Sequence, residues 1–248
     1  MAGWWNKKRK KLALRLGITV VALAVVGYVM WLVTPQSAQG VPLAAAKTIA
    51  TVAYSDQSQA IVLTPSIPAT KALLFYPDAR IDSAAYAYKL SAIAEQGVAI
   101  VIAKPIAHFA LVDLTSVASY KSLLPNITQW FVGGHSLGGV KACQTAGDAQ
   151  NGFKGLVLFA AYCNNDLSKA NIKALSIIGS ADQQTTQEQI DQNKLHMPAQ
   201  TTYQTINGLN HAGFGNYGAQ SGDDQMTIND DDARDQIAQF VARFVGMQ

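Results

Sequence analysis

The stretch that most constrains the fold of this chain is WFVGGHSLGGVKA, which covers residues 130–142. An apolar run leads directly into Gly133 and Gly134, a serine follows between small residues, and a segment of helical character begins at once. Glycine permits tight or left-handed backbone and removes the side chains that would crowd a turn. The pattern therefore predicts a sharp strand-to-helix turn that holds the side chain of Ser136 exposed and fixed.

The same turn carries a motif with a chemical meaning. Residues 134–138 read Gly-His-Ser-Leu-Gly and match G-x-S-x-G, with an apolar strand before them and a helix after them. The start of that helix directs backbone N–H groups and the positive end of its dipole toward the serine. We therefore expect Ser136 to be a nucleophile. The alternative is a glycine-rich turn in which the serine is incidental.

Apolar segments of strand length alternate with helical segments from residue 48 to residue 245. Such alternation predicts an α/β fold with a mostly parallel, doubly wound sheet that helices cover on both faces. No long insertion follows Ser136, so we expect an open site without a large lid domain. The expected strands are 48–54, 59–65, 72–77, 98–105, 128–134, 154–162, 173–182 and 201–208, the first two forming an antiparallel hairpin. The expected helices are 82–97, 112–124, 137–148, 185–194 and 230–245.

A serine nucleophile needs a base, and the base needs a carboxylate that orients it. Asp182 directly follows an apolar strand, and His211 lies in a glycine-bounded loop after the last strand. The chain order Ser136, Asp182, His211 is the order expected for this motif on such a sheet. Asp182 could instead cap the next helix, and Asp166 is the other candidate acid. Residues with a less suitable order or position are His108, His135, His196, Glu188 and Asp191.

Several stretches together resemble a known family. They are LLFYPDARIDSAAYAYKLSAIAEQGVAIVIAKP, FVGGHSLGGVKA, GLVLFAAY, IIGSAD and GLNHAGFGNYG, which cover most of 72–218. The chain resembles the α/β-hydrolases, and more narrowly a compact bacterial family related to the dienelactone hydrolases. This resemblance implies a Ser-His-Asp hydrolase with an N-terminal membrane segment. It does not imply a particular substrate, because this fold hosts many activities.

The chain departs from that family after the Tyr-Pro of the third strand, where Asp78 stands in place of a glycine. This loop is expected to supply an oxyanion-hole N–H beside that of Leu137. Ala79 is the favoured second donor and Asp78 the less favoured one. A carboxylate beside a developing oxyanion is unfavourable, so we expect the Asp78 side chain to point away. Arg80 and Lys104 lie at the same sheet edge, and they either bind an acidic substrate group or pair with surface acids.

The N-terminal part differs from the rest in charge. Residues 1–47 hold seven basic and no acidic residues, whereas the remaining 12 basic and 16 acidic residues give residues 48–248 a net charge of −4. The main domain therefore offers no argument for nucleic-acid binding. Residues 16–33 form an uncharged, mostly apolar run that would span about 27 Å as a helix, close to the thickness of a bilayer core.

A basic block before an apolar run predicts a signal anchor with a cytoplasmic N-terminus and an extracytoplasmic domain. Trp4, Trp5, Tyr28 and Trp31 are candidate interface residues. The alternative is a signal peptide that is cleaved, which would release a secreted protein. The expected organisation is a basic tail at 1–15, a transmembrane segment at 16–34, a linker at 35–47 and a hydrolase domain at 48–248.

The remaining features limit cofactors and substrates. Cys143 and Cys163 could form a disulfide or stay as two buried thiols, and no spacing of cysteines and histidines is typical of a metal site. We therefore expect no metal and no cofactor. The sequence predicts a membrane-tethered serine hydrolase that cleaves small or exposed carboxylic esters through an acyl-enzyme. A non-catalytic tethered binding domain and a cell-envelope peptidase or thioesterase are the alternatives.

Overall fold

A computed structural model describes residues 2–246, apart from the side chains of residues 2–10, 12, 32 and 33. The chain divides into two units between Pro35 and Gln36. The first unit is helix α1, Ala2–Val33. The interfacial positions expected for Trp4 and Trp5 concern side chains outside the described residues.

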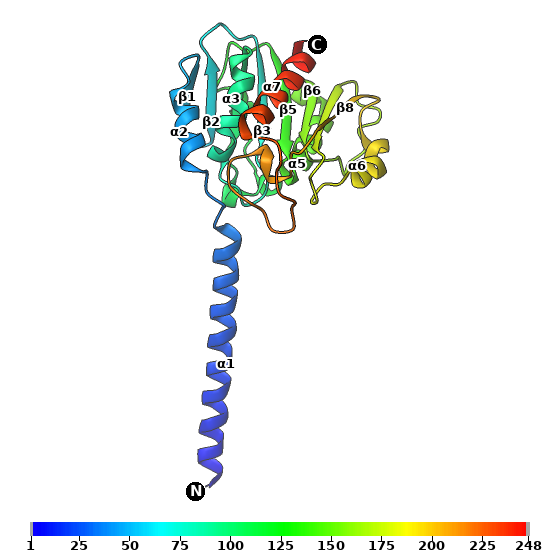
Figure 1. The fold of residues 1–248 in the computed structure, drawn as a ribbon. Coiled ribbons are helices and arrows are strands. Elements are labelled where there is room, and N and C mark those ends of the chain that lie inside the picture. The colour runs from blue at the N-terminus through cyan, green and yellow to red at the C-terminus, as the bar shows by residue number, and fades with distance from the viewer. Residues whose placement is uncertain (1, 247–248) are drawn as a thin grey trace. The chain divides into compact units, whose positions relative to one another are not determined.

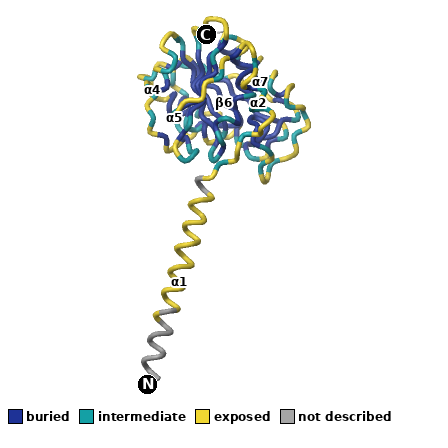
Figure 2. The backbone as a smooth tube through the Cα atoms, turned by 90° about the vertical axis from the view of Figure 1, so that its left-hand side faces the viewer, coloured by how far each residue is buried: buried dark blue, intermediate teal, exposed yellow. Residues whose placement is uncertain are grey.

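Helix α1 contains one segment that is long and apolar enough to cross a membrane. This segment, Ala13–Trp31, has a mean hydropathy of 2.0, and none of it is buried. Its described side chains are exposed all along the helix, as Figure 2 shows. A helix that is apolar on every side lacks the polar face of a soluble surface helix, so its composition suits a lipid environment.

The second unit is built on one eight-stranded sheet in the order β1-β2-β4-β3-β5-β6-β7-β8 (Figure 1). The β1–β2 and β2–β4 pairs are antiparallel, and every later pair is parallel. The expected hairpin and mostly parallel sheet are thus confirmed. The strands are β1 Val52–Asp56, β2 Ala60–Pro65, β3 Lys71–Tyr76, β4 Val98–Ala103, β5 Gln129–His135, β6 Phe153–Phe159, β7 Lys173–Gly179 and β8 Gln200–Ile206.

Helices cover both faces of this sheet, as the apolar strands require. One buried cluster joins the sheet to α2, α3 and α7, and a second joins the opposite face to α4 and α5. The helices are α2 Gly40–Thr48, α3 Ala87–Glu95, α4 Val117–Lys121, α5 Leu137–Gly147, α6 Gln187–Asn193 and α7 Asp230–Gly246.

Two expected segments differ from the structure. The segment expected as a linker contains α2, an Ala-rich helix that buries Ala46 in the first cluster. The helix expected at 112–124 is reduced to α4, because Ser116 caps the helix only at that point and accepts the N–H of Ser119. The residues just before it form short 3₁₀ turns.

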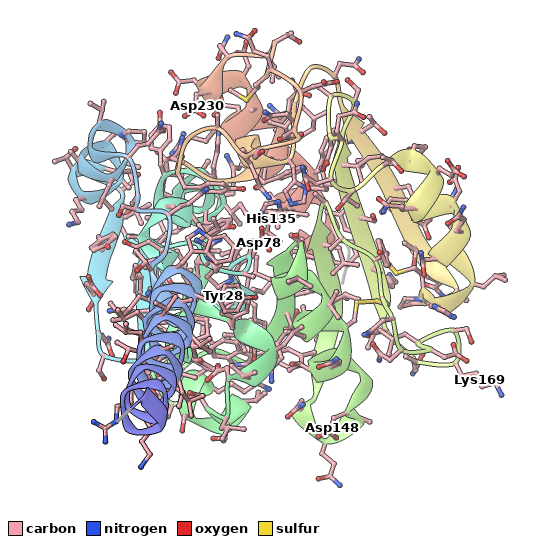
Figure 3. All side chains as sticks on the ribbon, turned by 90° about the horizontal axis from the view of Figure 1, so that it is seen from below. Tyr28, Asp78, His135, Asp148, Lys169 and Asp230 are labelled. Carbon is pink, nitrogen blue, oxygen red and sulfur yellow. A yellow bond between two sulfur atoms is a disulfide. The ribbon has the colours of Figure 1, made fainter. Side chains whose placement is uncertain are left out.

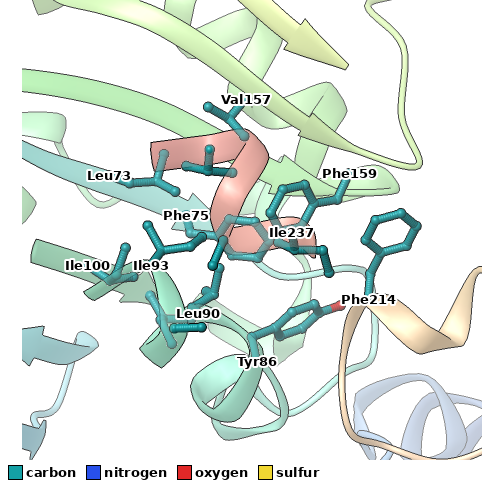
Figure 4. Close-up of a cluster of buried hydrophobic side chains, with 14 of the residues drawn as sticks. Leu73, Phe75, Tyr86, Leu90, Ile93, Ile100, Val157, Phe159, Phe214 and Ile237 are labelled. Carbon is teal, nitrogen blue, oxygen red and sulfur yellow. The ribbon is translucent and has the colours of Figure 1, made fainter. Parts of the chain in front are cut away.

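Aromatic side chains in the first cluster connect the sheet to the loop that follows β8. Phe75 and Phe159 have ring centroids 5.2 Å apart, and Phe159 stacks on Phe214 at 5.5 Å (Figure 4). Phe214 lies three residues after His211 and is fully buried. Burial of such a ring contributes on the order of 2–3 kcal/mol to folding, so the core itself fixes this loop.

Candidate active site

The turn between β5 and α5 has the geometry that the sequence predicts. Ser136 adopts φ 53° and ψ −122°, a strained backbone conformation for a residue with a side chain. A Cβ atom on Gly134 would lie 2.3 Å from the carbonyl oxygen of Gly138, and one on Gly138 would lie 2.1 Å from that of Tyr76. Both positions therefore require glycine, because any larger residue would open the turn.

The carboxyl ends of β7 and β8 bring Asp182 and His211 together. The Nδ1 atom of His211 lies 2.9 Å from Oδ2 of Asp182 in a hydrogen bond, and both side chains are almost wholly buried. The other oxygen of Asp182 accepts the N–H groups of Gln184 at 2.8 Å and Thr185 at 2.7 Å. These bonds fix the carboxylate, and the carboxylate in turn fixes the orientation of the imidazole ring.

The alternatives for these two residues have other partners. Helix α6 is capped by Thr186, which forms a capping box with Gln189, so Asp182 is not its cap. Asp166 is exposed and accepts the N–H of Ser168 at 2.8 Å. His196 contacts the carbonyl oxygen of Cys163 through Nδ1 at 3.2 Å. None of these contacts involves His211.

Asp78 lies at the centre of the site, and the expectation that its side chain points away is wrong. Its Oδ1 accepts the N–H of Ala79 at 2.7 Å and the N–H of Leu137 at 3.3 Å. Its own N–H donates to the hydroxyl of Tyr86 at 3.1 Å. The two favoured oxyanion donors do converge, but the oxygen they hold belongs to the protein. A carboxylate is the strongest acceptor near these N–H groups, and the start of α5 favours negative charge.

The Oδ2 atom of Asp78 faces Nε2 of His211 at 3.8 Å. Among the described residues, Nε2 of His211 has no hydrogen-bond partner, so the hydroxyl of Ser136 does not bond to it in this state. The two neighbours of Ser136 are connected to His211 in different ways. The rings of His135 and His211 are 4.4 Å apart. The N–H of Leu137 bonds to Asp78, and Asp78 in turn faces His211. Ser136 therefore directly follows a residue whose ring adjoins the imidazole.

Sequence reasoning missed the support that Tyr86 and His135 give to this site. The Tyr86 hydroxyl accepts from the N–H of Asp78 and shares a second hydrogen bond of 2.9 Å with Nδ1 of His135. Figure 3 shows Asp78 and His135 close together in the middle of the domain. Burial, and then the nearby His211, lower the pKa of His135 to about 3, so this ring is neutral. The signal in the sequence was a histidine inside an otherwise small-residue turn.

Two carboxylates control the charge of His211. Burial lowers its pKa, but Asp182 and Asp78 together raise it further, to about 9. For Asp78, burial raises the carboxyl pKa, yet the His211 and His135 rings and the N–H of Ala79 lower it below its ordinary value. In the free protein at neutral pH, an imidazolium therefore lies between two carboxylates.

Three buried side chains at this point could also hold a cation. Ligand atoms of Asp78, His135 and His211 lie within 4.8 Å of one another, and nitrogen and oxygen ligands of this kind suit zinc. A metal ion there would take the lone pair on Nε2 of His211. Since that lone pair is what a general base uses, metal binding and base catalysis at His211 would exclude each other.

Lys104 and Arg80, the two basic residues expected near the site, have different bonding partners. Lys104 bonds to Asp56 at 2.9 Å and to the carbonyl oxygen of Gln57 at 3.0 Å, which is the surface pairing that the sequence left open. Arg80 has φ 60°, and its N–H donates to the carbonyl oxygen of His108. Binding of an acidic substrate group by either residue stays a prediction.

A hollow of about 520 Å³ borders the outer side of the histidine loop. Its lining includes Ala212, Asp223, Asp224 and Asp230, but neither Ser136 nor His211. Asp223 accepts the N–H of Ala212 at 3.0 Å, so this acidic surface helps to position the loop that carries His211. The hollow therefore borders the residues that hold the histidine loop in place.

Three solved structures with a similar fold have low sequence identity to this chain. Est1E from Butyrivibrio proteoclasticus has a TM-score of 0.55 and 14% identity, over 79% of this chain and 100% of its own. Thermogutta terrifontis esterase 2, phosphoramylated by tabun, has a TM-score of 0.57 and 11% identity, over 81% and 96%. The esterase domain of a Rhodothermus marinus protein has a TM-score of 0.53 and 13% identity, over 74% and 92%.

At these identities the similarity shows the fold alone. In a sequence search, no curated protein matches the chain. The model of the alpha/beta hydrolase family matches residues 72–235, a range that contains the β5–α5 turn, Asp182 and His211. The chain therefore belongs to the alpha/beta hydrolase family.

Proposed function

We propose that the protein is a serine hydrolase that cleaves carboxylic esters with Ser136, His211 and Asp182. The observation that carries this proposal is a buried Asp182–His211 hydrogen bond beside a serine held at φ 53°, directly after His135, whose ring lies 4.4 Å from the same imidazole. A strained nucleophile and an oriented base are the two elements that acyl transfer requires.

In the proposed reaction, Nε2 of His211 takes the proton of Ser136 as its oxygen attacks the ester carbonyl carbon. Asp182 stabilises the imidazolium, and the N–H groups of Ala79 and Leu137 stabilise the oxyanion. The carbon–oxygen bond to the alcohol breaks, and the alcohol leaves with the proton from His211. Water then attacks the acyl carbon and gives a proton to His211. The bond between the acyl group and Ser136 breaks, the serine oxygen takes that proton back from His211, and the acid leaves.

Esters are favoured as substrates for two reasons. The solved structures of similar fold include proteins described as esterases. Within residues 2–246 the strands after β5 are joined by short segments that leave no separate lid domain over the turn. An uncovered site gives little area for burying a long acyl chain, which favours small or exposed esters.

One observation favours the second candidate, a non-catalytic binding domain. The oxyanion donors are taken by Asp78, and the Ser136–His211 hydrogen bond is not formed. Such bonds often tighten only when substrate is present, so the free state does not decide between the two functions. A direct test of the reactivity of the serine does.

That test is labelling with a fluorophosphonate together with ester hydrolysis by the full chain in detergent. We expect the label on Ser136 in the parent protein and none in Ser136→Ala. Loss of the nucleophile should reduce kcat by a factor on the order of 10⁶. Ester hydrolysis by Ser136→Ala within tenfold of the parent would refute the assignment, and a parent that neither labels nor hydrolyses esters would support the binding domain.

We also propose that α1 tethers the domain to a membrane as an uncleaved signal anchor, with the N-terminus in the cytoplasm and the hydrolase domain outside. Support comes from the apolar segment Ala13–Trp31 and from the basic residues before it. A tethered enzyme would act on esters at or near the membrane surface.

A further inference from the structure

We propose that Asp78 determines the substrate class, and that the preferred esters carry an ammonium group on the carbon beside the scissile carbonyl. This inference rests on the proposed serine hydrolase function. Asp78 holds the oxyanion N–H groups until a substrate arrives, and the substrate's ammonium then pairs with the displaced carboxylate.

The first step is that substrate and Asp78 compete for one position. Oδ1 of Asp78 accepts from Ala79 and Leu137 at 2.7 and 3.3 Å, which is the hydrogen bonding that an oxyanion would receive. Two oxygens cannot occupy that position at once. The carboxylate must therefore rotate away before the carbonyl oxygen of an ester can use these donors.

The second step is that the carboxylate of Asp78, once displaced, loses all of its hydrogen-bond and charge partners at the same time. The residue is only 5% exposed, so its charge needs a partner within the protein or the substrate. Its described partners are the two N–H groups and the imidazolium of His211 at 3.8 Å. The substrate takes the N–H groups, and His211 must become neutral to accept the proton of Ser136.

The other groups that face Asp78 do not replace these partners. His135 is neutral, and the hydroxyl of Tyr86 is hydrogen-bonded to that ring. The buried phenol of Tyr217, whose pKa burial raises well above its ordinary value, also stays uncharged. A positive charge brought by the substrate compensates the carboxylate where these neighbours cannot.

The third step fixes where that charge lies on the substrate. Side-chain rotation moves the carboxylate of Asp78 by only a few ångströms, because the Cβ atom stays with the backbone. The carboxylate thus remains next to the carbonyl, where it can pair with a charge on the carbon beside that carbonyl. The net charge of −4 on residues 48–248 also attracts cationic esters, whereas an acidic acyl group would be repelled.

The test compares glycine ethyl ester with ethyl propionate, in which a methyl group of similar size replaces the ammonium. Values of kcat/KM are measured at pH 7 by titration of the released acid, for the full chain in detergent. Amino esters are intrinsically more reactive, so the readout is the ratio of the two esters in each variant relative to the parent. Asp166→Asn, which changes an exposed carboxylate after β6, is the matched control.

We expect Asp78→Asn to lower the ratio of glycine ester to propionate by about tenfold or more, as loss of a charge-assisted contact predicts. Asp166→Asn should keep the ratio of the parent. Asp78→Gly removes the side chain that occupies the oxyanion N–H groups. It should also lower the ratio of glycine ester to propionate and raise kcat/KM for ethyl propionate. This variant provides the test if Asp78→Asn does not fold.

An unchanged ratio in both Asp78 variants, with Ser136 still labelled by fluorophosphonate, would overturn this inference and leave the serine hydrolase intact. Absence of labelling and of hydrolysis of both esters would overturn the proposed function, and this inference with it. The two failures are distinguishable because fluorophosphonate reacts with the serine without an ester acyl group.

Discussion

Asp182 and Asp166 are both carboxylates that follow parallel strands. Substituting each in turn tests which of them orients the imidazole of His211. Only Asp182 bonds to His211, and its two oxygens accept three hydrogen bonds in a buried position. Asp182→Asn keeps the shape but removes the charge that stabilises an imidazolium, a change worth roughly 10⁴ in rate in serine proteases. We expect a loss of that order for Asp182→Asn and a change within a few-fold for Asp166→Asn.

The comparison is made on ester hydrolysis at equal folded concentration, with circular dichroism as the check on folding. A crippled Asp166→Asn beside a normal Asp182→Asn would show that the orienting acid follows β6 and not β7.

The pH dependence of hydrolysis is a second prediction at the scale of a residue. The groups that face His211 are Asp182, Asp78 and His135, and the two carboxylates raise its pKa to about 9 despite burial. A general base must be unprotonated, so kcat/KM should rise with pH and level off only above about pH 9. Asp78→Asn removes one of the two carboxylates and should move this inflection to lower pH.

The measurement is a pH profile of kcat/KM for the parent and for Asp78→Asn with ethyl propionate. An inflection that stays in place, or moves upward, would show that Asp78 does not hold the proton on His211 in the free enzyme.

The role of a residue could be predicted from the sequence where its position in a turn or after a strand determines that role. Ser136 needs a tight turn between glycines, Asp182 follows a plainly apolar strand, and His211 lies in a glycine-bounded loop after the last strand. The donors Ala79 and Leu137 follow from the same positions. The rotamer of Asp78 could not be read, because it depends on the N–H groups, the helix start and the imidazole that meet only in the fold.

At the scale of elements, the sheet was the most predictable part. Its central strands are continuous apolar runs of the kind that a sheet buried on both faces accommodates, and each expected strand overlaps an observed one. Helix α2 was not predicted, because its Gly, Pro and Ala composition is typical of a linker and its stability comes from burying Ala46 against the domain. Tertiary packing thus overrides local preference there.

A disulfide between two elements gives a prediction at this scale. Cys143 in α5 is bonded to Cys163, which follows β6, and both side chains are fully buried. Closing a loop of about 20 residues stabilises a fold by roughly 3 kcal/mol through the unfolded chain. We expect Cys143→Ala with Cys163→Ala to lower the free energy of unfolding by about 2–4 kcal/mol.

Urea unfolding of the two-residue variant and of the oxidised and reduced parent measures this effect. Reduction should destabilise the parent and leave the variant unchanged. A parent as stable as the variant under oxidising conditions would mean that the two sulfur atoms contribute no cross-link in solution.

At the scale of the whole molecule, charge and hydropathy are divided between the two units. All basic residues of the first unit lie in the first half of α1, between Lys7 and Arg15, whereas residues 48–248 are acidic overall. The division between Pro35 and Gln36 falls just after the apolar segment, so the unit that folds around the sheet needs no part of the helix for its core. Such a separation suits a domain that folds on one side of a membrane while its helix remains in it.

The last prediction concerns the orientation of that arrangement. Lysines and arginines before the apolar segment Ala13–Trp31 favour a cytoplasmic N-terminus, and in the proposed arrangement the chain after this segment lies outside the cytoplasm. Protease added to intact spheroplasts that express the full chain should therefore digest the hydrolase domain, while a cytoplasmic marker stays protected. Replacing residues 7–11 by neutral residues should reduce the digested fraction, since it removes most of the charge that sets the orientation. A domain that resists protease until detergent opens the membrane would place it in the cytoplasm, and a domain found free in the medium would show that the segment is cleaved.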